Sequence, residues 1–100
     1  MYFITVFEKI EPSETMFAEF GCKRTWGYYP EYEMAANTLR NNVTDLCEGC
    51  YKYAVIEKIG AGICAICEGR QWFVWDKEKH GYIEMDEPEC VKHLVNFAIG

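Results

Sequence analysis

Five stretches of the chain carry apolar, β-branched and aromatic residues in the pattern of β-strands. They are residues 1–10, 23–29, 51–59, 71–76 and 82–85. In a strand, successive side chains point to opposite faces. Tyr2, Ile4 and Val6 therefore share one face of the first stretch, and Ala54 and Ile56 lie opposite the other apolar residues of the third. This pattern predicts strands that each bury at least one face.

Two further stretches have the spacing of helices. Across residues 30–42 the apolar positions recur at steps of three and four, which places one buried stripe along a helix. The stripe consists of Tyr32, Ala35, Ala36, Leu39 and Val43. Pro88 stands where a short final helix would begin, because proline is well tolerated in a first turn. That helix would carry Cys90, Val91, Leu94 and Phe97 inward.

The predicted elements follow one another in the order β-β-α-β-β-β-α. Turn signals separate the strands at residues 11–14, at residues 60–62 and in a polar loop of hairpin length at residues 77–81. Such an order builds an antiparallel sheet that has its helices on one face. We therefore expect a single compact α+β domain over residues 1–100, with a sheet of about five strands and two helices on one face.

The composition is that of a folded domain. Hydrophobic residues make up 50% of the chain and aromatic residues 16%, which argues against intrinsic disorder. The apolar runs are only a few residues long, so we expect no membrane-spanning helix. The first residues lack the basic region and the cleavage site of a signal peptide. We therefore expect a cytoplasmic protein whose six cysteines are reduced thiols.

The net charge of −6 disfavours direct binding of nucleic acid. Recognition of phosphates needs clustered Lys and Arg, and the ten basic residues here are scattered along the chain. The acidic run at residues 84–89 can instead face a partner protein with a basic surface. Its alternative is a solvated loop that precedes the final helix.

Two Cys-x-x-Cys pairs are the strongest chemical signal in the chain. Cys47 and Cys50 form one pair, Cys64 and Cys67 form the other, and thirteen residues separate them. Four thiolates can hold one tetrahedral zinc ion, although this gap falls short of the usual length of roughly fifteen to twenty residues. The predicted strand at 51–59 lies between the pairs, so they meet only if the chain turns back at 60–62 and pairs antiparallel. A small zinc-ribbon-like structural module is one alternative, and ordinary buried or half-buried thiols are the other.

Other reactive groupings are weaker. A thioredoxin-type pair places its reactive thiol at a helix N-terminus, whereas the first pair here precedes a strand and Glu48 would raise its thiol pKa. A thiol redox protein is therefore a second alternative. Ser13 is the only serine, and Cys90 with His93 three residues later is a weak signal for a nucleophile or a metal. We expect no catalytic residues, no enzymatic activity and no cofactor, with zinc as the one alternative.

Aromatic residues gather on two of the predicted strands. They are Trp26, Tyr28 and Tyr29 on one and Trp72, Phe73 and Trp75 on the other. Because helices cover only one face of the expected sheet, some of the second set would be partly exposed. Exposed Trp and Tyr are frequent anchors of protein interfaces. We expect the partner-binding surface to consist of Trp72, Trp75, Glu84, Asp86, Glu87 and Glu89.

Several segments together resemble one protein family. They are Met1-Tyr2-Phe3-Ile4-Thr5, Tyr53-Ala54-Val55-Ile56-Glu57-Lys58-Ile59 followed by Gly62-Ile63, Trp72-Phe73-Val74-Trp75-Asp76, Lys92-His93, and Asn96-Phe97-Ala98-Ile99-Gly100. Essentially from end to end, the chain resembles a family of small uncharacterised proteins abundant in plasmids, phages and conjugative elements of anaerobic gut bacteria. The resemblance implies a cytoplasmic accessory protein carried on mobile DNA, with no catalytic residues. It also implies that a metal site at the four cysteines would be particular to this chain, since relatives often have other residues there.

The expected function is therefore binding of another protein. We expect a non-enzymatic accessory protein of mobile genetic elements that inhibits a host defence factor or a nucleic-acid-handling factor. Its carboxylates would occupy positions where the target expects phosphates, an expectation that rests on analogy.

Overall fold

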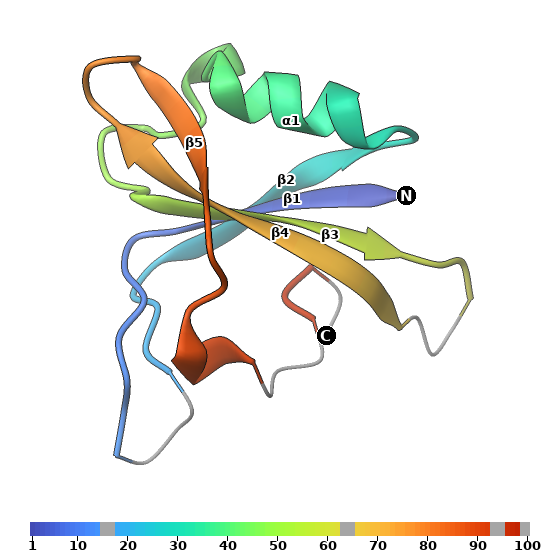
Figure 1. The fold of residues 1–100 in the computed structure, drawn as a ribbon, viewed down its shortest axis with the longest axis horizontal. Coiled ribbons are helices and arrows are strands. Elements are labelled where there is room, and N and C mark those ends of the chain that lie inside the picture. The colour runs from blue at the N-terminus through green and yellow to red at the C-terminus, as the bar shows by residue number, and fades with distance from the viewer. Residues whose placement is uncertain (15–17, 63–65, 93–95, 99–100) are drawn as a thin grey trace.

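The computed structural model describes residues 1–14, 18–62, 66–92 and 96–98. In chain order the elements are β1 (Tyr2–Phe7), β2 (Lys23–Tyr29), α1 (Tyr32–Arg40), the 3-10 turn η1 (Val43–Asp45), β3 (Tyr53–Ile59), β4 (Cys67–Asp76), β5 (Gly81–Met85) and the 3-10 turn η2 (Glu89–Val91). Figure 1 shows a twisted sheet with α1 on one side and η2 with the C-terminal segment on the other.

The five strands form one antiparallel sheet in the order β2-β1-β3-β4-β5. Because β1 lies between β2 and β3, the connection that contains α1 carries the chain over β1. Ile4 is directly opposite Ile56, and Val6 is opposite Ala54. This register joins the apolar positions of β1 and β3 on one face, as their alternation predicts. The two edges of the sheet are β2 and β5.

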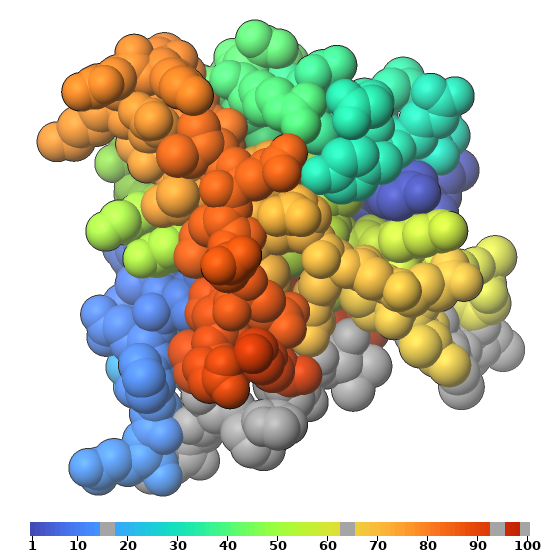
Figure 2. Space-filling view, viewed as in Figure 1, coloured from blue at the N-terminus to red at the C-terminus, as the bar shows by residue number. Residues whose placement is uncertain are grey.

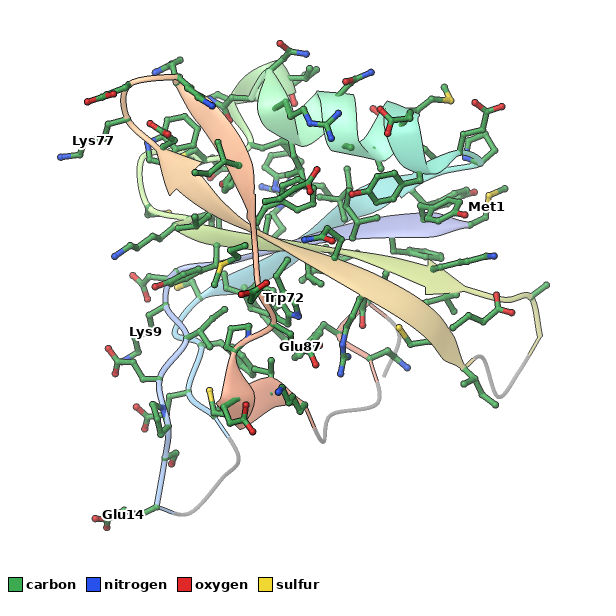
Figure 3. All side chains as sticks on the ribbon, viewed as in Figure 1. Met1, Lys9, Glu14, Trp72, Lys77 and Glu87 are labelled. Carbon is green, nitrogen blue, oxygen red and sulfur yellow. The ribbon has the colours of Figure 1, made fainter. Side chains whose placement is uncertain are left out.

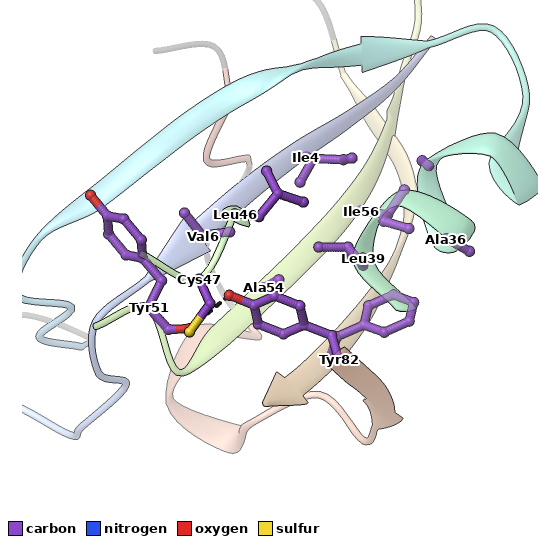
Figure 4. Close-up of a cluster of buried hydrophobic side chains, with 12 residues drawn as sticks. Ile4, Val6, Ala36, Leu39, Leu46, Cys47, Tyr51, Ala54, Ile56 and Tyr82 are labelled. Carbon is purple, nitrogen blue, oxygen red and sulfur yellow. Dashed lines mark hydrogen bonds between the residues drawn. The ribbon is translucent and has the colours of Figure 1, made fainter. Parts of the chain in front are cut away.

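The larger core lies between the sheet and α1. It consists of Ile4, Val6, Ala35, Ala36, Leu39, Leu46, Cys47, Tyr51, Ala54, Ile56, Phe73 and Tyr82. Figure 4 shows Leu39 of α1 facing the side chains of β1 and β3. The Tyr82 hydroxyl donates a hydrogen bond of 2.7 Å to the Tyr51 carbonyl oxygen. Burial raises the pKa of Tyr82, so this hydroxyl keeps its proton and remains a donor.

The opposite face of the sheet is buried without an α-helix. Its core consists of Phe7, Ala18, Val55, Trp72, Val91 and Phe97. The ring centroids of Phe7 and Trp72 are 5.4 Å apart, and Phe97 lies 5.1 Å from the first and 5.4 Å from the second. The segment between β1 and β2 and the segment after β5 supply this cover. Each face of the sheet therefore carries a buried core.

The predicted α+β class and the five antiparallel strands are confirmed, and the strand at Lys23–Tyr29 has the predicted bounds. The predicted ends of β3, β4 and β5 also agree with the structure. In contrast, β1 ends at Phe7 and not at residue 10, and β4 begins at Cys67 and not at residue 71. The order of elements differs from the prediction in two places. The 3-10 turn η1 lies between α1 and β3, and the 3-10 turn η2 stands where the last helix was predicted. No helix among the described residues combines the length and the apolar character needed to cross a bilayer.

The prediction of two helices on one face is wrong. The described residues contain one α-helix, and the predicted last helix is replaced by η2, whose Val91 packs on the face opposite α1. The Val91 carbonyl oxygen accepts a hydrogen bond of 3.3 Å from Arg70, and the Phe97 N–H donates one of 3.0 Å to Glu57. Side chains of the sheet thus form hydrogen bonds with backbone groups that would bond to one another within a helix. Leu94, which the sequence places inward, lies outside the described residues.

Candidate functional site

Trp72, which the sequence places at the interface, is buried. Its side chain is 1% exposed and contacts the rings of Phe7 and Phe97. Trp72 Nε1 donates a hydrogen bond of 3.0 Å to Glu87 Oε2, and Figure 3 shows the two residues side by side. In this structure Trp72 is therefore not accessible to a partner. The reason is that the C-terminal segment covers the face of the sheet that α1 leaves open.

Glu87 is also engaged within the molecule. Besides the bond from Trp72, its Oε2 atom lies 2.8 Å from Arg70 Nε. Although desolvation opposes it, the hydrogen bonds from Trp72 and Arg70 lower the pKa of Glu87, so this carboxylate stays ionised. Glu87 therefore stabilises the C-terminal segment, and its predicted role as an interface residue is not supported by its position.

Three of the predicted interface acids remain at the surface. Glu84 Oε1 lies 3.0 Å from Arg40 Nη2, and Glu89 Oε2 lies 2.8 Å from Lys92 Nζ, yet both carboxylates are exposed. Asp86 is exposed as well. Figure 2 shows this segment on the surface, between the β4–β5 hairpin and η2. The run can face a partner, but two of these charges are partly compensated.

Trp75 reaches the surface in part. It is half-buried and packs against the core beneath α1. Its ring lies edge-on to those of His80 and Tyr82, with centroids 5.3 Å apart in both pairs. Of the two aromatic anchors predicted on β4, only Trp75 is accessible to another molecule.

The described cysteines of the two pairs lie at opposite ends of β3. Cys47 and Cys50 precede this strand, whereas Cys67 pairs with Ile59 at its far end. The chain does turn back and pair antiparallel, but that pairing keeps Cys67 beside the turn, roughly 20 Å along the strand from the first pair. Cys64 lies outside the described residues. Within the described ranges, no three His, Cys, Asp or Glu side chains form a metal-binding group.

The described thiols lack the setting of a redox pair. The Cys50 N–H donates to the Cys47 carbonyl oxygen at 2.9 Å, so the pair forms a tight turn and does not begin a helix. Desolvation, followed by the carboxylates of Glu48 and Glu8, raises the pKa of the Cys50 thiol. Desolvation also raises the pKa of Cys67. A raised pKa favours the protonated thiol, which is a weak nucleophile.

The second reactive pair is only partly described. His93 lies outside the described residues. Cys90 is half-buried against the core opposite α1, which is the inward position that the sequence predicts. This cysteine therefore has the surroundings of a structural thiol.

A groove lies between β2 and the segment formed by α1 and η1, and we call it the β2–α1 groove. It has a volume of about 300 Å³ and is lined by Ile4, Trp26, Gly27, Tyr28, Tyr29, Thr38, Val43, Thr44 and Leu46. The lining contains no Cys, His, Lys, Arg, Asp or Glu. The groove therefore offers apolar surface and hydroxyl groups, which suit binding better than acid-base or nucleophilic catalysis.

A β-bulge brings Trp26 to the groove. The pairing of β1 with β2 shifts so that Ile4 is opposite Gly27 while Thr5 is opposite Thr25. Trp26 is the extra residue, and it packs against the core beneath α1. A bulge in an edge strand re-aims a side chain and discourages pairing with a foreign strand. The edge of β2 is therefore built to present a side chain, not a free backbone ladder.

The indole of Trp26 has an unusual environment. Trp26 Nε1 is buried, and no hydrogen-bond partner is found for it among the described residues. The Arg24 guanidinium lies over the ring, 3.9 Å from its centroid, and donates to Glu48 at 3.0 Å. An unpaired buried N–H costs about 1–3 kcal/mol. A molecule that brings a hydrogen-bond acceptor to this N–H would remove that cost.

Large apolar side chains are exposed around the same groove. Tyr28 and Val43, which line it, are 58% and 43% exposed, and Met34, one helical turn before Thr38, is 45% exposed. These are three of the five large apolar side chains that the described residues expose. Thr38 Oγ1 lies 3.0 Å from Tyr29 Oη, which joins α1 to β2. The prediction that Val43 continues the buried stripe is wrong, because α1 ends before it.

Comparison with protein-family models, with curated proteins and with solved structures finds no match to this chain. Trp26, Tyr28 and Tyr29 are visible in the sequence as an aromatic cluster. The sequence does not show the β-bulge that places Trp26 at the groove. It also does not show that η1 forms part of the lining of the groove. Sequence reasoning therefore found the aromatic residues and missed the site.

Proposed function

We propose that this protein binds another protein and catalyses no reaction. The observation that carries the proposal is the β2–α1 groove, which is lined by exposed apolar side chains and by Trp26, whose buried N–H has no hydrogen-bond partner among the described residues. A partner segment that inserts an apolar side chain, with a carbonyl oxygen beside Trp26 Nε1, would match both features. Trp and Tyr are the residue types that most often carry binding energy at interfaces.

The size of the groove limits what enters it. A volume of about 300 Å³ is at the lower end of ligand sites and holds a side chain or two, not a folded element. The exposed rim at Tyr28, Met34 and Val43 extends the apolar surface beyond this volume. A contact of this kind, with one anchored side chain and an apolar rim, is typical of recognition between proteins.

We further propose that the partner has a basic surface and is a host defence or nucleic-acid-handling factor. The net charge of −6 and the exposed carboxylates of Glu84, Asp86 and Glu89 support a basic partner, because they would speed association at low salt. The resemblance to proteins of mobile genetic elements supports the role of an accessory protein that inhibits such a factor. Carboxylates would then take the place of nucleic-acid phosphates on the target.

Affinity capture from a host lysate, followed by binding measurements with the purified partner, tests the proposal. Trp26→Phe keeps an aromatic ring and removes the N–H, and Val43→Asp places a charge on the rim. We expect each change to weaken binding by about tenfold or more without lowering the melting temperature. Ile66→Asp is the matched control, because Ile66 is exposed but does not line the groove.

The outcomes separate the parts of the proposal. Unchanged binding in both groove variants would exclude the groove as the docking site. An equal loss in the Ile66→Asp control would show nonspecific apolar contact. A partner whose association rate does not fall as salt is raised would contradict the basic surface.

A further inference from the structure

A second cavity lies on the other side of the loop that follows α1. Its volume is about 270 Å³, and its lining includes Asp45, Cys50, Lys52, Trp75, Lys77 and His80. The loop before β3 forms one wall, and the end of β4 with the β4–β5 hairpin forms the other. It shares no lining residue with the β2–α1 groove, so what it binds is independent of the function proposed above.

We propose that this cavity binds a phosphate monoester carried on an aromatic or heterocyclic ring, such as a nucleoside monophosphate. Lys52, Lys77 and the imidazole of His80 would contact the phosphate oxygens. Trp75 would contact the ring of the ligand. Binding is the whole proposal, and no bond is made or broken.

The charges of the lining favour an anion. Lys52 and Lys77 have no ion pair within the described ranges, whereas Lys9, Arg24 and Lys92 are each paired with a carboxylate. The one acidic group in the lining is Asp45, which already accepts a hydrogen bond of 3.1 Å from Asn42. Two lysines and an imidazole against one carboxylate make this a basic pocket on a chain whose net charge is −6.

The backbone around the cavity is held in an unfavourable conformation. Among the described residues, the non-glycine residues with positive φ are Asn42, Thr44, Asp45, Glu48 and His80. All five lie in the two loops that form its walls. Each such residue costs of order 1 kcal/mol or more, and residues of this kind cluster at ligand sites. At His80, φ is 53°, a conformation that glycine adopts without cost, so this position carries an imidazole in a strained conformation.

The number of lysines in the cavity favours a phosphate ligand over a carboxylate ligand. A phosphate monoester carries a charge of about −1.5 to −2 at neutral pH and has three acceptor oxygens, so it matches two lysines and a ring N–H. A carboxylate has one charge and two oxygens, and a single lysine compensates it. The long-range field of the acidic chain opposes any anion. Affinity must therefore come from the short-range contacts with Lys52, Lys77 and His80.

The thiols in the lining do not favour a catalytic role for the cavity over ligand binding. Two thiols line the cavity, and the raised pKa of the exposed one, Cys50, keeps it protonated. Cys47, which also lines the cavity, is buried in the core. The arrangement is therefore suited to holding a ligand.

Titration of the intact protein with AMP, monitored by NMR shifts of backbone amides and tryptophan indoles, tests the proposal. We expect saturable shifts at Trp75, Lys77 and His80. The double variant Lys52→Gln/Lys77→Gln should weaken AMP binding by about tenfold or more, because it removes two charged donors. The control Lys23→Gln/Lys58→Gln changes the net charge equally at two exposed lysines outside the cavity, and it should leave binding unchanged.

Three further probes identify the group that is recognised. Inorganic phosphate should bind at the same residues more weakly than AMP, and adenosine and benzoate should not bind there. Equal affinity for phosphate and AMP would overturn the role of the ring, and equal affinity for adenosine and AMP would overturn the role of the phosphate. Binding of benzoate as tight as that of AMP would overturn the choice of phosphate over carboxylate. Absence of saturable shifts with AMP, or unchanged binding in Lys52→Gln/Lys77→Gln, would overturn the site itself.

Discussion

The Glu57 carboxylate on β3 accepts the backbone N–H of Phe97, forty residues further along the chain, at 3.0 and 3.1 Å from its two oxygens. The Ala98 N–H adds a bond of 3.1 Å, and Arg70 Nη1 lies 3.5 Å away. The side chain of Glu57 is 0% exposed. This buried carboxylate therefore fastens the C-terminal segment to the face of the sheet opposite α1, where it covers Trp72.

The buried carboxylate predicts an unusual pH dependence of stability. Desolvation raises the pKa of Glu57, and the N–H groups of Phe97 and Ala98 with the Arg70 cation offset this only in part. A folded state with a raised carboxyl pKa holds a proton that the unfolded chain has already lost. The stability that Glu57 contributes is therefore fully present below the ordinary carboxyl pKa and decreases as the pH rises through the raised value. Chemical denaturation from about pH 3 to about pH 8 measures this decline.

Glu87 should act in the opposite direction. Because its pKa is lowered in the folded state, its contribution to stability is present above the ordinary carboxyl pKa and is lost as the pH falls through the lowered value. Glu57→Gln should therefore abolish the decline toward higher pH and keep the loss at low pH. Glu87→Gln should do the reverse. Identical pH profiles for the wild type and Glu57→Gln would contradict the assignment.

Gly81→Ala should destabilise the protein. A Cβ at Gly81 would overlap the carbonyl oxygen of Arg40 at the end of α1. Because this oxygen belongs to the backbone, α1 and β5 would have to separate, and we expect a loss of about 1–3 kcal/mol in the free energy of unfolding. Gly69→Ala on β4 is the control, since nothing lies within 4 Å of a Cβ there. Equal denaturation midpoints for the two variants would show that α1 and β5 do not touch in this way.

The protein should fold without metal. Two hydrophobic cores and a chain that is 50% hydrophobic can supply the stability that small zinc modules obtain from the ion. We expect the circular dichroism spectrum and the melting temperature to be the same before and after treatment with a strong chelator. Loss of the fold, with release of about one zinc ion per chain, would instead favour the zinc-ribbon-like alternative.

Thiol reactivity should follow exposure in the native protein. Cys22 and Cys50 are exposed, whereas Cys47 is buried. An alkylating reagent should modify Cys22 first and Cys50 more slowly, because the pKa of Cys50 is raised, and it should reach Cys47 only after unfolding. Peptide mapping by mass spectrometry measures the order. Rapid labelling of Cys47, or a mass deficit that corresponds to a disulfide in freshly isolated protein, would contradict this expectation.

The strands and α1 follow from patterns that are local in the sequence. A period of two places Ile4 and Val6 on one face of β1 and Ala54 and Ile56 on one face of β3, whatever the rest of the chain does. Helical spacing likewise predicts the buried Ala35, Ala36 and Leu39 of α1. These predictions are confirmed because a backbone period depends only on neighbouring residues.

The C-terminal segment shows where local pattern is insufficient. Pro88 and the apolar spacing after it are compatible with a helix, whereas the described residues of this stretch form only the 3-10 turn η2. The competing hydrogen-bond partners, Glu57 and Arg70, lie on β3 and β4 and come near only after the sheet has formed. The same C-terminal segment, which is distant in sequence, buries Trp72, a residue that the sequence places at the interface.

The chain's sequence by itself determined an acidic, aromatic-rich α+β domain with most of its strands, because composition and periodicity are carried by single residues and their neighbours. Tertiary structure alone decided both candidate sites. The register between β1 and β2 makes Trp26 a bulge residue, and η1 then closes the groove beside it. Lys52 and Lys77, twenty-five residues apart, meet at one cavity because β3 and β4 pair antiparallel. Strand register and strand pairing depend on how all the strands pack together, so they cannot be predicted from a pattern within one segment of the sequence.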